Sequence, residues 1–307
     1  MNTASVIVAI VKASIALLVF GLGLHGTPRD ATYLFRRPNL LARALLSMSV
    51  VMPLTAFLLT ILFRLHPAVK VALITLAMSP VPPFLPGRAM KAGGQSAYTI
   101  GLLTATSLLS IAIVPFTVWV FSALFRVPFT VSSVEIARVV TGSVLIPLLI
   151  GMIVRHFVPA TAERAARLVT LLALGVLVAG LIPILFSAWP AIETLLGNGT
   201  VLAIVAMTLV GLGVGHFIGG PDRDHRTVLA LSSAARHPGV ALAIASANFP
   251  GDKLVPAAIL LALIITSLVS APYVKRSTQI HEASSAHAHG AAHEIEQRAD
   301  HGPNRPR

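Results

Sequence analysis

Long runs of residues without a charged side chain set the main constraint on this chain. Residues 92–125, 168–192 and 194–221 contain no Asp, Glu, Lys or Arg. A helix needs about 20 apolar residues to cross the hydrocarbon core of a bilayer. Of the 307 residues, 55% are hydrophobic and only 11% are charged, a composition outside the range of soluble globular proteins. The sequence therefore predicts an all-α polytopic membrane protein.

The apolar stretches, bounded by charges, prolines and glycines, predict nine transmembrane helices. We expect them near residues 6–25, 39–63, 69–91, 96–121, 134–155, 168–189, 200–220, 227–248 and 254–274. The first stretch contains Lys12 and lacks a small-residue cleavage site, so a retained helix is expected rather than a signal peptide. Residues 1–274 should form one transporter domain. Residues 275–307 carry few large apolar side chains and should form a disordered, His-rich cytoplasmic tail.

The positions of the basic residues explain most of the net charge of +12. The loops after the odd-numbered helices contain Arg29, Arg36, Arg37, Arg88, Lys91, Arg155, Arg164, Arg167, Arg223, Arg226, Lys275 and Arg276, and the opposite loops contain only Arg64, Lys70, Arg126 and Lys253. This bias predicts an inner-membrane protein with its N-terminus outside and its C-terminus in the cytoplasm. Nucleic-acid binding is not expected, because no basic stripe with interleaved aromatic residues is present. The absence of cysteine excludes disulfides and thiolate metal sites.

Prolines interrupt two of the predicted helices at membrane depth. The third helix contains Pro80, Pro82, Pro83, Pro86 and Gly87, and the eighth contains Pro238 and Gly239 directly after Arg236 and His237. A proline inside a helix removes an N–H donor and clashes with the preceding turn. Unwound backbone in a bilayer is tolerated only where protein or a water-filled cavity covers it. Two interrupted helices are typical of transporters with inverted repeats and a site near the midplane. Two proline kinks in an ordinary bundle are the alternative.

A short similarity between the two halves supports the repeat. Thr106-Ser107-Leu108-Leu109-Ser110 and Thr266-Ser267-Leu268-Val269-Ser270 each lie in the helix that follows an interrupted one. With nine helices, the first repeat would contain four and the second five. The fold class expected is thus an all-α membrane bundle with inverted repeats (4+5) and two broken, crossing helices.

Several short motifs, taken in order and spacing, identify a family. They are Phe20-Gly21-Leu22-Gly23-Leu24, Pro28, Asp30, Leu34-Phe35, Arg37-Pro38, Met52-Pro53 with Thr55-Ala56, Ala92-Gly93-Gly94, Gly213-Val214-Gly215 with Gly219, and Gly239 through Phe249. The sequence resembles the bile acid:sodium symporter family, in its nine-helix type. The resemblance implies a panel and a core subdomain, with the two broken helices crossing in the core beside the path of the substrate.

The sequence departs from the sodium-coupled members of that family at the positions that bind the cations. The resemblance places Leu85-Pro86 where those members have Ser-Asn, Ser232 in place of Glu, Arg236 in place of Gln, and Met48 in place of Gln in the second helix, while Thr99 keeps a hydroxyl and Leu103 does not. Sodium needs several oxygen ligands, as hard cations generally do. A sodium site is therefore possible but most of its expected ligands are missing, and no other cofactor or metal is predicted.

The charged side chain predicted in the middle of the broken eighth helix is a cation. All eleven acidic residues lie in loops, at helix ends or in the tail, whereas Arg236 lies within a predicted helix. An arginine there costs about 2.5–3.5 kcal/mol and must meet an anion, carbonyl groups or water. One hypothesis is that Arg236 replaces the sodium ion and balances an anionic substrate. The alternative is that it caps carbonyls freed at the break in the third helix. His237 could titrate near neutral pH and link transport to protons, or serve as a hydrogen-bonded packing residue.

The function predicted is secondary transport of an organic anion by alternating access around the two breaks. The partners expected are a small organic anion and the lipid bilayer. Alternatives are a sodium-independent facilitator or exporter of the same fold, and a membrane sensor module whose tail contacts a partner. An enzyme is not expected, because no HExxH, GxSxG or Ser-His-Asp arrangement lies at membrane depth.

Overall fold

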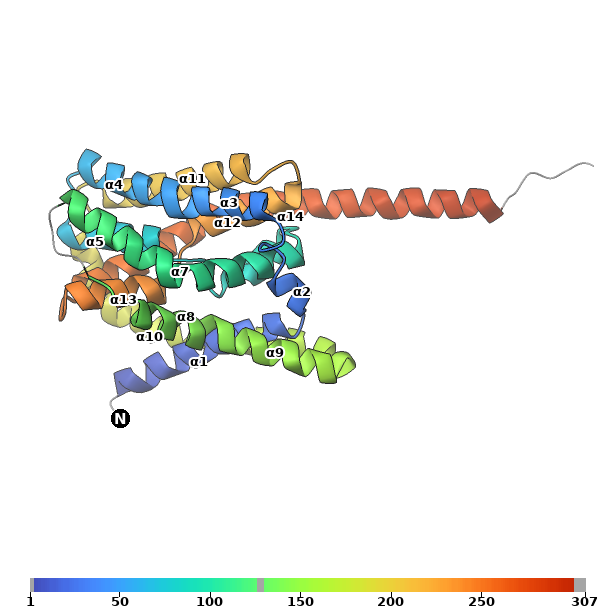
Figure 1. Ribbon diagram of the computed structural model, residues 1–307, viewed down its shortest axis with the longest axis horizontal. Helices are drawn as coiled ribbons and strands as arrows, with labels where there is room; N and C mark the ends of the chain where they lie inside the picture. The colour runs from blue at the N-terminus through green and yellow to red at the C-terminus, as the bar shows by residue number, and fades with distance from the viewer. Residues whose placement is uncertain (1–2, 126–129, 301–307) are drawn as a thin grey trace, which may run out of the picture.

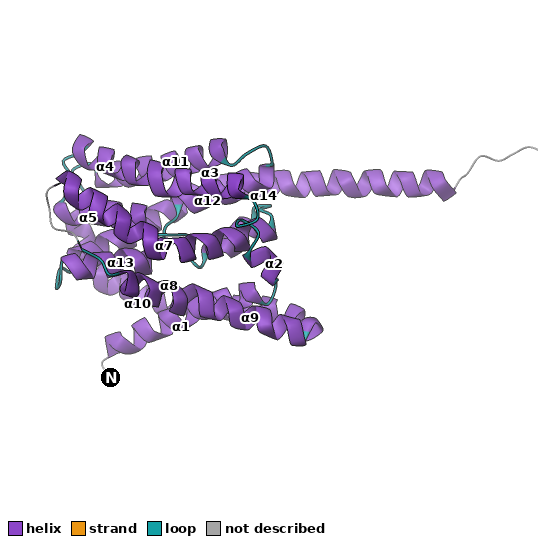
Figure 2. Cartoon of the chain, in the orientation of Figure 1, coloured by secondary structure: helices purple, strands orange, loops and turns teal. Residues whose placement is uncertain are grey.

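A computed structural model describes residues 3–125 and 130–300, and these residues are helical with short connections and no strand. Eight of the helices are long and apolar enough to cross a membrane (Figure 2). They are Val6–Gly23, Pro38–Leu62, Ser96–Ala123, Ser133–Phe157, Pro159–Leu195, Thr200–Ile218, Arg223–Asn248 and Leu254–Ser284. The predicted all-α polytopic membrane architecture is confirmed.

The elements follow one another along the chain with few long connections. They are α1 (Thr3–Gly23), α2 (Pro28–Ala31), α3 (Pro38–Leu45), η1 (Leu46–Val51), α4 (Met52–Leu62), α5 (Pro67–Met78), α6 (Leu85–Lys91), α7 (Ser96–Phe125), α8 (Ser133–Val140), η2 (Thr141–Leu145), α9 (Ile146–Phe157), α10 (Pro159–Leu195), α11 (Thr200–Ile218), α12 (Arg223–Ala234), α13 (Pro238–Asn248) and α14 (Leu254–Asp300). The segments η1 and η2 are π-helical. Each lies inside a longer helix, α3–η1–α4 and α8–η2–α9 respectively, where π turns occur mostly as single-turn bulges.

Two non-helical segments lie where the sequence predicted interruptions. Residues 79–84 separate α5 from α6, and residues 235–237 separate α12 from α13. Pro80, Pro82 and Pro83 lie within the first segment, whereas Pro86, Gly87, Pro238 and Gly239 lie in the first turns of α6 and α13, directly after the segments. Proline is tolerated there, since the first N–H groups of a helix have no intrahelical acceptor. The helices α5 and α6 are individually too short to count among the eight spans.

The helices form two groups (Figure 1). The smaller helix group comprises α1, α8–η2–α9 and α10, with α1 packed on α9 and α10. The larger helix group comprises the remaining long helices, in which α11 packs on α12 and α14 packs on α5 and α11. The groups meet where α8 packs on α7 and α13, and where α10 packs on α14. The segment 235–237 precedes α13 and so lies next to this boundary.

Close backbone approach fixes the position of α12 in the larger helix group. A Cβ atom on Gly211 or Gly215 of α11, or on Gly219 at its C-cap, would lie only 2.5–2.7 Å from backbone atoms of α12. The three glycines are four residues apart and therefore share one face of α11. Small residues at this spacing allow membrane helices to pack backbone against backbone. The C-terminal end of α12, which leads into Arg236, is held by this contact.

The C-terminal region differs from the expectation of a disordered tail beyond residue 274. The helix α14 continues to Asp300 and projects beyond the bundle, at the end opposite the N-terminus (Figure 1). Residues 275–300 are rich in alanine and include Glu and Gln, which have high helix propensity. Thr278 Oγ1 also donates a hydrogen bond of 3.2 Å to the carbonyl of Lys91, which attaches the start of the projection to the bundle. The rest of the predicted tail, residues 301–307, lies outside the described residues.

Candidate functional site

The two non-helical segments contact each other directly. The backbone N–H of His237 donates a hydrogen bond of 2.9 Å to the carbonyl of Pro80. Ser79 and Ala235, which end α5 and α12, both have extended backbone angles. The bond satisfies one donor and one acceptor that helical hydrogen bonding leaves free, as buried backbone requires. The segments therefore form one site rather than two separate kinks.

Arg236 lies at the centre of this site and is only 3% exposed. Its Nε donates to the carbonyl of Leu76 at 3.2 Å, and its Nη2 donates to the carbonyls of Ala77 and Met48. Leu76 and Ala77 belong to the last turn of α5, where helix carbonyls lack the N–H groups of a following turn. The carbonyl of Leu76 also accepts from the backbone N–H of Ser79 at 2.9 Å. These bonds match the alternative in which Arg236 caps carbonyls freed at the first break. The role of Arg236 toward a substrate stays a prediction.

The remaining nitrogen of Arg236 is available for a further contact. Nη1 is buried and has no hydrogen-bond partner among the described residues. The ion pairs in the described part of the chain, Arg138–Glu135 and His225–Asp222, lie elsewhere. The three carbonyls solvate the guanidinium without neutralising it. A full positive charge therefore persists in the interior of the bundle.

The carbonyl of Met48 is free to accept from Arg236 because of the π-helical segment η1. In a regular α-helix the N–H of Met52 would bond to this carbonyl, but here it bonds to the carbonyl of Ser47. The next residue, Pro53, has no N–H. The sequence analysis named Met48 for its side chain. The structure shows that its backbone carbonyl makes the contact.

A buried hydroxyl pair joins η1 to α12 beside Arg236. Ser47 Oγ and Ser233 Oγ are 2.7 Å apart, and both side chains are fully buried. Each hydroxyl therefore has a partner in an interior where an unpaired polar group is costly. This pair and the Arg236 contacts hold η1, the end of α5 and the end of α12 together.

His237 caps α13 and reaches the smaller helix group. Its Nδ1 accepts from the backbone N–H groups of Gly239 at 3.1 Å and Val240 at 3.4 Å. Because Nδ1 is an acceptor, the ring proton of the neutral imidazole is assigned to Nε2. That nitrogen lies 3.2 Å from Ser143 Oγ of η2, and the Ser143 hydroxyl donates to the carbonyl of Val139 at 2.7 Å. Ser143 thus accepts from His237, and the bond crosses the boundary between the two groups.

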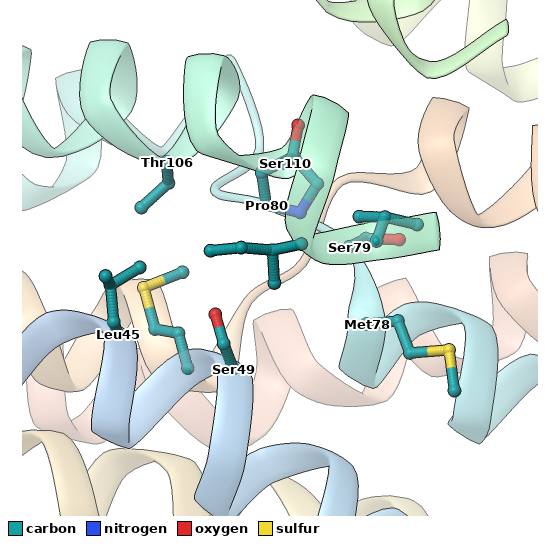
Figure 3. Close-up of a pocket in the computed structure, with 10 residues that line it drawn as sticks. Leu45, Ser49, Met78, Ser79, Pro80, Thr106 and Ser110 are labelled. Carbon is teal, nitrogen blue, oxygen red and sulfur yellow. The ribbon is translucent and has the colours of Figure 1, made fainter. Parts of the chain in front are cut away.

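A small pocket opens beside the first break (Figure 3). It lies between η1, residues 79–80 and α7, and the hydroxyl side chains around it are Ser49, Ser79, Thr106 and Ser110. Three of these hydroxyls donate their hydrogen to a carbonyl of their own helix, at 2.7 Å for Ser79, 2.8 Å for Thr106 and 2.7 Å for Ser110. They therefore present lone pairs to the pocket. Such a lining suits water or the donor groups of a ligand.

The other residues expected to bind an ion lie in α6, α12 and α7. Leu85 and Pro86 are buried in α6, Ser232 is buried in α12, and Thr99 of α7 donates to the carbonyl of Gln95 at 2.8 Å. In the residues that the structure describes, no group of three or more His, Cys, Asp or Glu side chains is placed to hold a metal ion.

Sequence reasoning did not identify Ser143, although a signal was present. Residues 47–53 read SMSVVMP and residues 141–147 read TGSVLIP, so a small hydroxyl residue, a Ser-Val pair and a proline recur at the same spacing. The two stretches contain η1 and η2, which begin at the ninth residue of the helical spans Pro38–Leu62 and Ser133–Phe157. Arg236 contacts the first stretch and His237 contacts the second.

Comparison with known proteins gives two matches. A sequence model of the Sodium Bile acid symporter family matches residues 13–197. The chain is also similar to the uncharacterized sodium-dependent transporter YocS of Bacillus subtilis (strain 168), with 25% identity over 255 residues that cover 80% of this chain and 76% of the relative. The matched range of the family model includes η1, the first non-helical segment and η2, and ends before Arg236.

Proposed function

Because the chain belongs to the Sodium Bile acid symporter family, we propose that it is a secondary transporter of an organic anion in which Arg236 takes the place of a coupling cation. The observation that carries the proposal is the set of three backbone carbonyls, from two different helices, that converge on the Arg236 guanidinium. Carbonyl oxygens are ligands that hard cations prefer. A guanidinium placed among them supplies the same positive charge permanently.

The side chains at the positions expected to bind sodium support this substitution. Met48, Ser232, Leu85 and Pro86 offer no carboxylate, and all eleven acidic residues lie in loops, at helix ends or in the C-terminal region. A sodium ion would have to displace the guanidinium to reach the same carbonyls. Transport through this site then proceeds without sodium at that position. The relative YocS is described as sodium-dependent. The two proteins should therefore differ in whether transport requires sodium.

An anionic substrate is favoured by the charge that remains at the site. Arg236 has no carboxylate partner among the described residues, and its Nη1 has no partner. The N-terminus of α13 adds a positive partial charge next to it, since helix dipoles place about half a charge there. Broken helices in transporters use such ends to bind anionic groups. A carboxylate or sulfonate is the chemical class that fits.

The proposed transport cycle uses the two helix groups. We assign α5–α6 and α12–α13 as two interrupted crossings, which gives nine crossings, with the N-terminus outside and α14 leading into the cytoplasm. The smaller helix group acts as the panel and the larger helix group as the core. The contacts between the breaks would move as one unit with the core during alternating access. Inverted repeats of four and five helices belong to the same proposal.

Reconstitution of the purified protein tests the proposal. A thermal-shift screen of carboxylates and sulfonates identifies an anion that binds, and uptake of that anion into proteoliposomes is then measured in sodium and in potassium. We expect uptake in both salts, and loss of sodium-independent uptake in Arg236→Gln. The matched control is Arg138→Gln, which removes an arginine whose side chain is 74% exposed. Unchanged sodium-independent uptake by Arg236→Gln would refute the fixed-cation role.

The same assay separates the alternatives. Uptake that runs equally in both directions without any ion gradient identifies a facilitator, and transport only out of inside-out vesicles identifies an exporter. Binding of an anion without any flux identifies a sensor. The first two outcomes would assign the protein to the sodium-independent alternatives, the third would contradict transport, and all three leave the family assignment in place.

A further inference from the structure

A group of polar side chains outside the site already described surrounds His225, in the first turn of α12. His225 is only 4% exposed, and its Nε2 lies 2.9 Å from Oε1 of Gln95, the residue before α7. Tyr33, which follows α2, donates its hydroxyl hydrogen to the same Oε1 at 2.9 Å, and Arg37 donates to the Tyr33 hydroxyl oxygen. The group joins the start of α12 to the start of α7 and to the connection after α2. It lies at the end of the bundle from which α14 projects (Figure 1).

These contacts fix which ring nitrogen of a neutral His225 carries the hydrogen. An amide oxygen only accepts hydrogen bonds, so Nε2 is the donor toward Gln95. A neutral imidazole has a single ring N–H, and Nδ1 is then a bare lone pair. Nδ1 lies 3.2 Å from Oδ2 of Asp222, which is also an acceptor, and it has no hydrogen-bond partner among the described residues. Two acceptors thus face each other across the space of one proton.

The Asp222 carboxylate has a second place to go. Asp222 is the N-cap residue of α12, a position at which aspartate commonly accepts from the N–H groups of the first turn. Its side chain makes no such bond here. The side chain is 66% exposed, so it can turn between His225 and the helix end without repacking the interior. A proton on Nδ1 would favour the position at His225, because a charge-assisted hydrogen bond is stronger than a neutral one.

Charges of both signs and one aromatic ring surround His225. In the described part of the chain, Asp222 and Asp224 of its own turn favour a positive imidazolium, and Arg37 opposes it. Burial opposes the charge as well. The ring of Tyr98 in α7 lies with its centroid 4.5 Å from that of His225, and an aromatic ring attracts a cation at this distance. These opposing influences leave His225 in the range of about pH 5 to 8 in which histidine changes its charge.

We infer that His225 and Asp222 form a proton-binding site that fastens the first turn of α12 when it is occupied. The proton, taken from water, lies between Nδ1 and the carboxylate, while Nε2 continues to hold Gln95. Loss of the proton to water releases Asp222 to cap α12. Because α12 leads into Arg236, the pH on this side of the membrane acts on the helix that positions the guanidinium. The inference depends neither on the substrate nor on the direction of transport.

A double-mutant cycle at two pH values tests the site. Asp222→Asn keeps an N-cap side chain but lacks the charge, and His225→Gln keeps a donor for Gln95. Unfolding of wild type, both single variants and the double variant is followed in detergent at about pH 5 and about pH 8. The coupling between the two residues should change the unfolding equilibrium constant about fivefold at the lower pH, since one partner is exposed, and less than about twofold at the higher pH.

The exposed pair Glu135 and Arg138 supplies the matched control. It has the same i,i+3 spacing, and both groups stay ionised over this pH range. The cycle of Glu135→Gln and Arg138→Gln should therefore give the same small coupling at both pH values. Equal coupling of Asp222 and His225 at both pH values would show that Nδ1 keeps its hydrogen in the neutral ring, as a reversed Gln95 amide would require, and would overturn the inference. Absence of coupling at both would overturn it too.

Nuclear magnetic resonance of isotope-labelled histidine gives a second readout that does not require His225→Gln to fold. The wild type is titrated from about pH 5 to about pH 8. The exposed substitution Asp222→Asn identifies the His225 signal, because loss of the neighbouring negative charge should move its titration to lower pH. A set of histidine signals in which none responds to Asp222→Asn would overturn the proton site, as would a responding signal that stays neutral throughout the wild-type titration.

Discussion

Replacing Arg236 with glutamine should destabilise the protein and create a binding site for sodium. Arg236 satisfies the carbonyls of Leu76, Ala77 and Met48. The carbonyl of Leu76 keeps the N–H of Ser79 as a donor, but the shorter glutamine amide does not reach both of the other carbonyls, so one or two buried carbonyls lose their donor, at about 1–3 kcal/mol each. A total of about 3 kcal/mol corresponds to a Tm lower by roughly 5 °C for a chain of this size.

Sodium should restore part of this loss in the variant. An ion that binds the vacated carbonyls with a Kd of about 10 mM adds, at about 150 mM, roughly 1.6 kcal/mol of stability by mass action. Differential scanning fluorimetry of Arg236→Gln should therefore give a Tm about 2–3 °C higher in sodium than in potassium. Wild type and the control Arg138→Gln should show no difference between the salts. An Arg236→Gln protein with wild-type Tm, or with the same Tm in both salts, would refute the reasoning.

Three further predictions concern the structure around the site. Ser47→Ala and Ser233→Ala should each cost about 1–2 kcal/mol in detergent unfolding, because each leaves the buried partner hydroxyl unpaired, and the double variant should cost less than the sum. A strictly additive cycle would contradict that pairing. Gly215→Ala should prevent folding, measured by size-exclusion chromatography, because its Cβ would lie 2.5 Å from the backbone of α12, whereas Gly213→Ala meets nothing within 4 Å and should be tolerated. Removal of residues 285–307 should leave uptake unchanged, and loss of uptake would instead favour the sensor alternative.

The sequence predicted the main features of the fold because hydrophobicity and proline act locally. Uncharged runs locate membrane helices whatever they pack against. Pro80, Pro82 and Pro83, which lie between α5 and α6, stop a helix whatever surrounds them. Pro238, the first residue of α13, disfavours the helical conformation in the residue before it. The exact ends of the breaks could not be predicted, because Pro86 and Pro238 are equally compatible with a break and with the first turn of a helix. The helical continuation of α14 to Asp300 was missed, since composition indicates only that the segment lacks a core.

The partners of the key residues required the structure. The sequence indicated that Arg236 must meet carbonyls, water or an anion, but it left the choice open. The partner carbonyls come from the end of α5 and from η1, which are distant in sequence. A π turn changes which carbonyl is free by one residue, and no composition signal marks it. Ser143 was missed because no composition signal marks the π turn η2 in which it lies. The recurrence of a Ser-Val pair and a proline at the same spacing in residues 47–53 and 141–147 was nevertheless visible in the sequence.

Measurement of sodium flux alongside anion uptake tests the central claim most directly. Proteoliposomes that contain wild-type protein are supplied with the anion found by screening, and with radioactive sodium, under an imposed sodium gradient and under potassium alone. A fixed cation at Arg236 predicts equal initial rates of anion uptake in both conditions and no accompanying entry of sodium. Uptake that stops in potassium, with sodium entering in step with the anion, would show that the protein uses a bound ion where we place the guanidinium.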